Sequence, residues 1–222
     1  MILAAGRGER LRPLTDTTPK PLLEVAGETL IERHLARLAA AGFREIVINV
    51  SHLGDLIERR LGDGRAWDVD IRYSREPGTP LETAGGIVRA LPLLGADPFL
   101  VVNADIWTDY PFAALAARQA AAHLVLVANP AHHPGGDFDL EGETVRRRPP
   151  GGAWTYAGIG VYAPDFFAGL ADGPAALAPL LFAACARGAV SGEVHAGRWL
   201  DIGTPARLAA ARAAAGAERQ QV

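Results

Sequence analysis

The stretch LAAGRGERLRPLTDTTPKPL, residues 3–22, follows a short apolar start and indicates how the chain begins to fold. An apolar strand that runs directly into a glycine-rich turn is typical of the first strand and loop of an open α/β sheet. Gly6 and Gly8 let backbone N–H groups approach a polyphosphate closely, because no Cβ stands in the way. The stretch therefore predicts a phosphate-binding loop directly after the first strand.

Two common phosphate loops do not fit this spacing. The dinucleotide fingerprint GxGxxG would need a glycine where Leu11 stands, and the GxxxxGK loop is absent because Lys20 follows Pro19. What remains is a glycine loop followed by the cations Arg10, Arg12 and Lys20, a set that suits a triphosphate. The alternative is an ordinary strand-to-loop turn with surface arginines.

Lys20 is the single lysine among 22 basic residues, and all the others are arginine. A lysine ammonium is a compact charge on a flexible stem, whereas a guanidinium is a planar fork, so a phosphate that moves during a reaction can require lysine. Chance is the alternative, since some position must hold the only lysine. Its place between two prolines behind the glycine loop favours a role in chemistry.

Length and composition limit the class of protein. A chain of 222 residues with 49% hydrophobic and 21% charged residues is typical of a compact globular protein of one large or two small domains. A formal net charge of −3 argues against a protein that mainly wraps nucleic acid. The single cysteine, Cys185, excludes an internal disulfide and a cysteine-based metal cluster. No apolar run of membrane-spanning length and no secretory signal are evident, so we expect a cytoplasmic protein with neither membrane nor nucleic-acid partners.

The first half of the chain alternates apolar strands with helical patterns. That order predicts an α/β fold, Rossmann-like and doubly wound, with a mixed and mostly parallel sheet in a three-layer αβα arrangement. Thr29 is the expected cap of the first helix and Gly42 its stop. The expected strands are 1–4, 45–50, 69–73 and 99–103, and the expected helices are 29–41, 53–61 and 83–94.

From His123 onward the pattern changes to shorter strands. We expect strands at 123–128, 137–140, 143–146 and 155–162, a helix at 177–187, a strand pair within 190–202, and a last helix from Pro205. The chain has no internal repeat and no segment that resembles a flexible linker. The sequence therefore predicts a single domain over residues 1–222.

Two aspartates follow apolar strands that lie far apart in the sequence. Asp105 comes after FLVVNA and Asp201 after RWL. Ligands of doubly wound sheets bind outside the carboxyl ends of the strands, so the glycine loop and Asp105 are expected at the same edge. Mg²⁺ takes one or two protein carboxylates and fills its other positions with water and phosphate oxygens. The pair predicts a Mg²⁺ site, while each aspartate alone also fits a turn residue or a helix cap.

Together these motifs resemble the sugar-phosphate nucleotidylyltransferases. Residues 3–22 are similar to the family signature LAAGxGxRLxPLTxxxPKPL, and the resemblance extends through PLETAGGI, VVNADI and WLDIGTP. Members of this family join a nucleoside triphosphate to a sugar 1-phosphate and release pyrophosphate. The resemblance implies the nucleotide-diphospho-sugar transferase fold, Mg²⁺ as cofactor, and these two small molecules as the partners of a monomer or weak dimer.

The resemblance also implies roles for individual residues. Arg10, Lys20 and Asp105 would be catalytic, and Asp105 and Asp201 would bind Mg²⁺. The nucleotide-binding part would cover about 1–110 and the sugar-binding part about 111–205. The nucleotide site would comprise Leu3, Ala4, Gly6, Gly8, Glu9, Arg10, Lys20, Glu76, Glu82 and Asn103, and the sugar site Asp137, Thr155 and Gly158.

Within the family, the chain is most similar to the short bacterial N-acetylmuramate 1-phosphate uridylyltransferases, on the residues EPGTPLETAGG, NADIWTDY and NPAHHPGGDF. That resemblance implies UTP and N-acetylmuramic acid 1-phosphate as substrates, in cell-wall recycling. One departure is VRRRPPGG, where many relatives have glutamate and lysine before proline, so the cation of the sugar side would be an arginine of the 146–148 run. Mannose 1-phosphate guanylyltransferase is an alternative activity, and a non-catalytic nucleotide-binding subunit is a more distant one.

Overall fold

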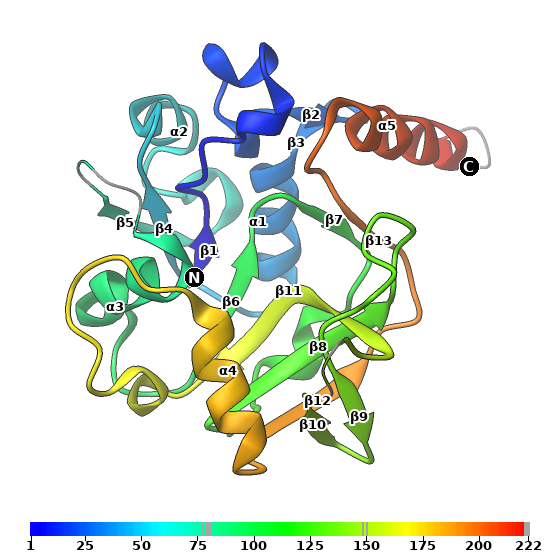
Figure 1. The fold of residues 1–222 in the computed structure, drawn as a ribbon. Coiled ribbons are helices and arrows are strands. Elements are labelled where there is room, and N and C mark those ends of the chain that lie inside the picture. Colours follow the sequence, from blue (N-terminus) through cyan, green and yellow to red (C-terminus); the bar gives the residue numbers. More distant parts are fainter. Residues whose placement is uncertain (77, 79–80, 148, 150, 220–222) are drawn as a thin grey trace. The chain divides into compact units, whose positions relative to one another are not determined.

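The computed structural model describes residues 1–76, 78, 81–147, 149 and 151–219 (Figure 1). The chain divides into two compact units. One unit holds Met1, Leu81–Val102 and Ala114–Gly197, and the other holds Ile2–Pro80, Asn103–Ala113 and Arg198–Val222. Among the described residues, no helix has both the length and the apolar character needed to cross a membrane. The organisation of the chain as a single domain stays a prediction.

The unit that begins at Ile2 contains the parallel strands expected from the sequence. The strand order is β5-β4-β1, and both neighbouring pairs run parallel. Every residue of β4 after its first is buried, which explains its continuous apolar sequence. The elements are β1 (Ile2–Leu3), α1 (Leu30–Ala40), β4 (Glu45–Val50), α2 (Gly54–Leu61) and β5 (Asp70–Arg75).

Helix α1 begins and ends where its sequence predicts. The Thr29 hydroxyl accepts a hydrogen bond from the backbone N–H of Glu32, and the Glu32 carboxylate accepts one from the N–H of Thr29. This reciprocal pair is a capping box, which satisfies N–H groups that a helix start otherwise leaves free. Gly42 follows the helix with a φ of 92°, a conformation that favours glycine. Both terminal predictions are confirmed.

The same unit contains two small antiparallel ladders and the last helix. These elements are β2 (Glu24–Val25), β3 (Glu28–Thr29), β7 (Ile106–Thr108), β13 (Trp199–Asp201) and α5 (Pro205–Arg219). They enclose a buried cluster that includes Leu11, Trp107, Ile202 and Leu208. The cluster joins the loop after the first strand to chain segments from the middle and the end of the sequence.

One expected pairing is wrong. The sequence predicted that the strands within 190–202 pair with each other, but β12 (Val190–Val194) pairs with β8 (Ala122–Ala128) and β13 pairs with β7. Strand β7 was not expected, because three residues are too few for a recognisable alternating pattern. The β7–β13 pairing is the contact that assembles the site described below.

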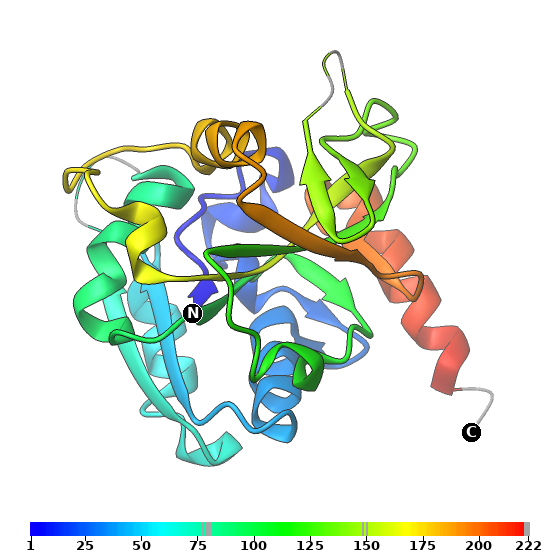
Figure 2. The ribbon, with the colours of Figure 1, turned by 90° about the horizontal axis from the view of Figure 1, so that it is seen from below.

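The unit that contains Leu81 has a sheet of mixed direction, in the order β6-β11-β8-β12-β10-β9. Of its paired neighbours, β8 and β12 run parallel and the others run antiparallel. Figure 2 shows the short β9–β10 hairpin, in yellow-green, at one end of this sheet. The remaining elements are α3 (Glu82–Leu94), β6 (Phe99–Asn103), β9 (Asp139–Glu141), β10 (Thr144–Arg146), β11 (Trp154–Tyr162) and α4 (Leu177–Ala186).

Candidate active site

The glycine loop closes around the stem of Lys20. Gly8 has a φ of 65°, and a Cβ at this position would lie 3.0 Å from Thr15 Cγ2 and 3.3 Å from Lys20 Cβ. The Thr15 hydroxyl donates a hydrogen bond of 2.9 Å to the carbonyl oxygen of Gly8. Both the backbone conformation and the close approach to Lys20 therefore require glycine here.

Gly6 has a different reason to be glycine. No atom lies within 4 Å of the place where its Cβ would stand. Gly6, Arg7, Glu9 and Arg10 are all exposed. The loop thus presents its backbone and two arginines to open space, as a site for an anionic ligand needs.

The two glycines predict different effects on folding. We expect Gly8→Ala to lower the free energy of unfolding by about 1–2 kcal/mol, because an L-residue is strained in the left-handed region and its Cβ crowds Thr15. Gly6→Ala is the matched control, and it is expected to change that free energy by less than about 0.5 kcal/mol. Urea unfolding of both variants measures the difference. Equal effects would contradict the packing role of Gly8.

Lys20 lies beside the first predicted metal ligand. It begins a short 3₁₀ turn, Lys20–Leu22, its side chain is buried, and its Nζ donates to Asp105 Oδ2. The structure therefore brings the lone lysine and Asp105 together, although 85 positions separate them in the sequence. A cation and a carboxylate in direct contact at the edge of a glycine loop form a charged centre suited to phosphate chemistry.

The second aspartate reaches the same place through the β7–β13 ladder. Asp201 lies opposite Ile106, and the N–H of Ile202 donates a hydrogen bond of 2.7 Å to the backbone carbonyl of Asp105. Two strand ends from distant parts of the chain are thus fixed by backbone hydrogen bonds. The other cation of the centre is Arg207, whose Nη1 lies 2.7 Å from Asp201 Oδ2. Sequence reasoning missed Arg207, because a lone arginine in an alanine-rich helix carries no motif.

The two carboxylates fit a Mg²⁺ site. In the described part of the chain, no group of three or more His, Cys, Asp or Glu side chains is arranged to hold a metal ion. Mg²⁺ does not need such a group, since it is commonly held by one or two carboxylates together with substrate phosphates. In the structure each aspartate is paired with a cation of the protein, Asp105 with Lys20 and Asp201 with Arg207. Hard oxygen donors beside an exposed phosphate loop suit this metal.

The expected base-binding residues of this unit form a buried network. Asn49, at the end of β4, accepts a hydrogen bond of 2.8 Å from the N–H of Ala4 and donates one of 2.6 Å to Glu76 Oε1. The carbonyl of Leu3 accepts from the N–H of Ala104, the residue after Asn103. Leu3, Ala4, Glu76 and Asn103 therefore meet at the strand ends next to the loop. Asn49 was missed, although a polar residue inside the apolar run EIVINV was a usable signal.

Glu82 belongs to the other unit. It is exposed, it is the first residue of α3, and its φ of 58° is unusual for a residue other than glycine. Such strained positions cluster at functional sites, since the surrounding structure must hold them in place. The role of Glu82 in binding the nucleotide base stays a prediction.

The predicted sugar-side residues lie near one another in that second unit. The Thr155 hydroxyl donates a hydrogen bond of 2.9 Å to Asn129 Oδ1, and Asp137 lies 3.0 Å from a ring nitrogen of His133. Asp137 Oδ2 accepts a hydrogen bond from the N–H of Tyr156, next to Thr155. Gly158 has a φ of 73° inside the irregular part of the β11–β8 pairing. Its glycine is therefore explained by the bulge itself.

Two arginines of the 146–148 run contact other side chains of the protein. Arg146 lies 3.4 Å from Glu141, and the Arg147 guanidinium stacks 3.9 Å from the centre of the Phe182 ring. Arg148 lies outside the described residues. Asn129 and His133 are further polar candidates of this unit, and both lie in the segment NPAHHPGGDF.

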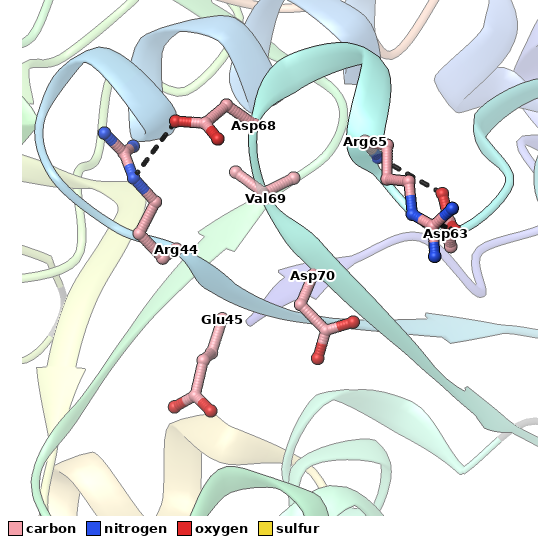
Figure 3. A pocket seen from close by; sticks show the side chains of 7 residues that line it. All are labelled: Arg44, Glu45, Asp63, Arg65, Asp68, Val69 and Asp70. Atoms are coloured by element: carbon pink, nitrogen blue, oxygen red, sulfur yellow. Dashed lines mark hydrogen bonds and ion pairs between the residues drawn. The ribbon is translucent and has the colours of Figure 1, made fainter.

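A separate hollow lies at the start of β4 and β5 (Figure 3). Its walls include Glu45 and Asp70, the first residues of the two strands, and the ion pairs Arg44–Asp68 at 3.5 Å and Arg65–Asp63 at 3.0 Å. It contains none of the predicted site residues. Ligands of such sheets bind at the carboxyl ends of the strands, so the candidate active site is the loop and not this hollow.

Comparison with known proteins assigns the family. The model of the nucleotidyl transferase family matches residues 1–136, which include the glycine loop, Lys20 and Asp105. The chain belongs to this family. This nucleotidyl transferase is 55% identical to the N-acetylmuramate alpha-1-phosphate uridylyltransferase of Neisseria meningitidis, over 98% of both chains. The predicted family resemblance is confirmed.

A more distant relative and a solved structure are also similar to this chain. This nucleotidyl transferase is 41% identical to a mannose-1-phosphate guanyltransferase of Hypocrea jecorina, over 50% of this chain and 31% of that protein. A crystal structure assigned as a glucose-1-phosphate thymidylyltransferase of Bacillus anthracis, with sucrose bound, covers 96% of this chain and is itself covered to 93%, with a TM-score of 0.85 at 23% identity. The structural likeness confirms the predicted fold class.

Proposed function

We propose that the protein is a uridylyltransferase that joins UTP and N-acetylmuramic acid 1-phosphate to give UDP-N-acetylmuramic acid and pyrophosphate. The observation that carries the proposal is the meeting of Lys20, Asp105 and Asp201 beside an exposed glycine loop. The 55% identity with a uridylyltransferase over nearly the whole length supports the choice of substrates. Cell-wall recycling, a cytoplasmic location and a monomer or weak dimer belong to the same proposal.

The reaction needs positioning and charge stabilisation rather than an enzyme nucleophile. An oxygen of the sugar 1-phosphate attacks the α-phosphorus of UTP and forms the new P–O bond. The bond between the α-phosphorus and the oxygen that bridges it to the β-phosphorus breaks, and pyrophosphate leaves with that electron pair. Lys20 and Arg10 stabilise the negative charge that develops on the phosphate oxygens, and the glycine loop offers its N–H groups.

Asp105 and Asp201 would hold Mg²⁺ in this reaction. When bound, the ion supplies positive charge between the two reacting anions and orients their phosphates. The chain's own contribution is to hold the backbones of the two aspartates close to each other, through the Ile202 N–H bond to the Asp105 carbonyl and the β7–β13 register. This pairing limits how far the two residues can move apart.

The proposed substrate-binding residues form two groups, one for the nucleotide and one for the sugar. Leu3, Ala4, Glu76, Glu82 and Asn103 are proposed for uridine, with Asn49 as the residue that orients Ala4 and Glu76. Sugar contacts are proposed for Asp137, Thr155 and Gly158, with Asn129 as the partner of the threonine. Burial raises the pKa of Tyr156 to about 12, so its hydroxyl stays neutral, and this hydroxyl lies 3.0 Å from that of Tyr162.

A grid of substrates tests the activity. We expect pyrophosphate release to be fastest for UTP with N-acetylmuramic acid 1-phosphate, when UTP, GTP, dTTP and ATP are each combined with N-acetylmuramic acid, N-acetylglucosamine, mannose and glucose 1-phosphates. A maximum for GTP with mannose 1-phosphate would favour the guanylyltransferase alternative instead. Nucleotide binding without turnover for any pair would indicate a non-catalytic subunit.

A further inference from the structure

Arg207 forms the second ion pair of the active site. It lies in the first turn of α5, and its side chain and that of Asp201 are 17% and 23% exposed. The backbone N–H of Arg207 donates to the Thr204 hydroxyl at 3.3 Å, which fixes the start of the helix. The guanidinium is therefore held against the Asp201 carboxylate by a rigid element and not by a mobile loop.

Gly203 leaves the room that this guanidinium occupies. A Cβ at position 203 would lie 2.1 Å from Arg207 Nη2 and 3.1 Å from Arg10 Nη2. Two cationic side chains, one from the glycine loop and one from α5, thus converge at the same glycine. Like charges repel, so this convergence is favourable only with anions nearby, and Asp201 is one such anion.

The pairing places Arg207 on an oxygen that a metal would need. Asp201 Oδ2 lies 2.7 Å from Arg207 Nη1, the length of a strong charge-assisted hydrogen bond. Mg²⁺ binds its oxygen ligands at about 2.0–2.1 Å, so an ion on this carboxylate would lie close to the guanidinium. Two cations at one carboxylate repel each other, so the Arg207 contact opposes metal binding at Asp201.

We propose that Arg207 is a positioning residue that competes with the divalent cation for the Asp201 carboxylate, so that its release favours metal binding. The inference rests on the metal site of the proposed function. Lys20 stands in the same relation to Asp105, so both carboxylates are neutralised by the protein itself. Phosphate oxygens of the nucleotide give the released guanidinium a new partner, so nucleotide and metal favour each other's binding.

The test is direct binding of Mn²⁺ to the nucleotide-free, full-length protein, followed by the electron paramagnetic resonance signal of free Mn²⁺. We expect Arg207→Gln to bind Mn²⁺ about fivefold more tightly than the wild type, or more, since it removes a competing ion pair worth about 1 kcal/mol. Gly203→Ala forces the guanidinium aside without removing its charge, and it should shift the affinity in the same direction.

Arg212→Gln is the matched control. This residue lies five positions further along α5, and its Nε donates to the carbonyl of Glu24 at 2.9 Å. Its loss removes the same charge without touching Asp201, so the Mn²⁺ affinity should stay within about twofold. If Arg207→Gln binds Mn²⁺ no more tightly than the wild type, while Asp201→Asn abolishes Mn²⁺ binding, the competition by Arg207 is overturned but the metal site is not. Wild-type binding by Asp201→Asn would overturn the metal site as well.

Discussion

Replacing Lys20 by alanine is expected to reduce turnover of UTP with N-acetylmuramic acid 1-phosphate by about 10²-fold or more. The ammonium contacts Asp105 and lies behind the glycine loop, so it is the cation placed to meet the charge that grows on the phosphates. The side chain is buried, and no other lysine exists in the chain to replace it. Steady-state kinetics should show the loss mainly in kcat, because the contact strengthens in the transition state.

Lys20→Arg keeps the charge and should still be impaired. The Lys20 side chain is only 11% exposed and its Nζ contacts Asp105, so a larger, planar guanidinium does not take the same place. Arg65→Ala is the control. It also removes one positive charge, but Arg65 lies in the separate hollow at the start of β5 and not in the candidate active site. Normal kcat and KM in both Lys20 variants would exclude the residue from the mechanism.

Asp201→Asn is expected to lower kcat/KM by about 10²-fold and to raise the Mg²⁺ concentration that gives half-maximal activity. The amide is neutral, so it loses the charge that attracts a hard cation while it keeps the shape of the side chain. The β7–β13 hydrogen bonds are formed by the backbone and remain, so the fold is expected to be retained. Activity measured over a Mg²⁺ series, together with thermal unfolding, tests both parts.

Asp63→Asn is the matched control for this change. Asp63 also belongs to an Asp–Arg pair, with Arg65 at 3.0 Å, but it lies in the separate hollow. Its substitution should leave the Mg²⁺ dependence unaltered. Equal activity of the wild type in chelator and in Mg²⁺ would contradict the assignment of Asp105 and Asp201 as metal ligands.

Most of the parallel part of the fold could be predicted from the chain. The run EIVINV reads as a buried strand because both of its faces are covered, and Thr29 with Glu32 marks a helix start by a local capping pattern. The glycine loop was also recognisable, since the spacing of Gly6, Gly8 and Lys20 is a property of one continuous segment. Such features depend on neighbours within a few residues.

Other features depend on contacts that no local pattern describes. Strand β7 is three residues long, and the partner of β13 is decided by where both segments meet in space. For the same reason, the sequence does not show that Asn129 accepts a hydrogen bond from the predicted site residue Thr155. Long-range pairing follows from packing of the whole chain, and its energy cannot be assigned to one segment.

The sequence by itself determined the family, the phosphate loop, and the three charged residues Lys20, Asp105 and Asp201, because these lie in continuous motifs. Only the tertiary structure decided that Lys20 pairs with Asp105 and that Arg207 pairs with Asp201. The reason is physical. A motif specifies which groups are present, whereas charge pairing depends on the distances between side chains, which are set only when the turn of Lys20, the residues before β7 and the start of α5 have packed in the folded chain.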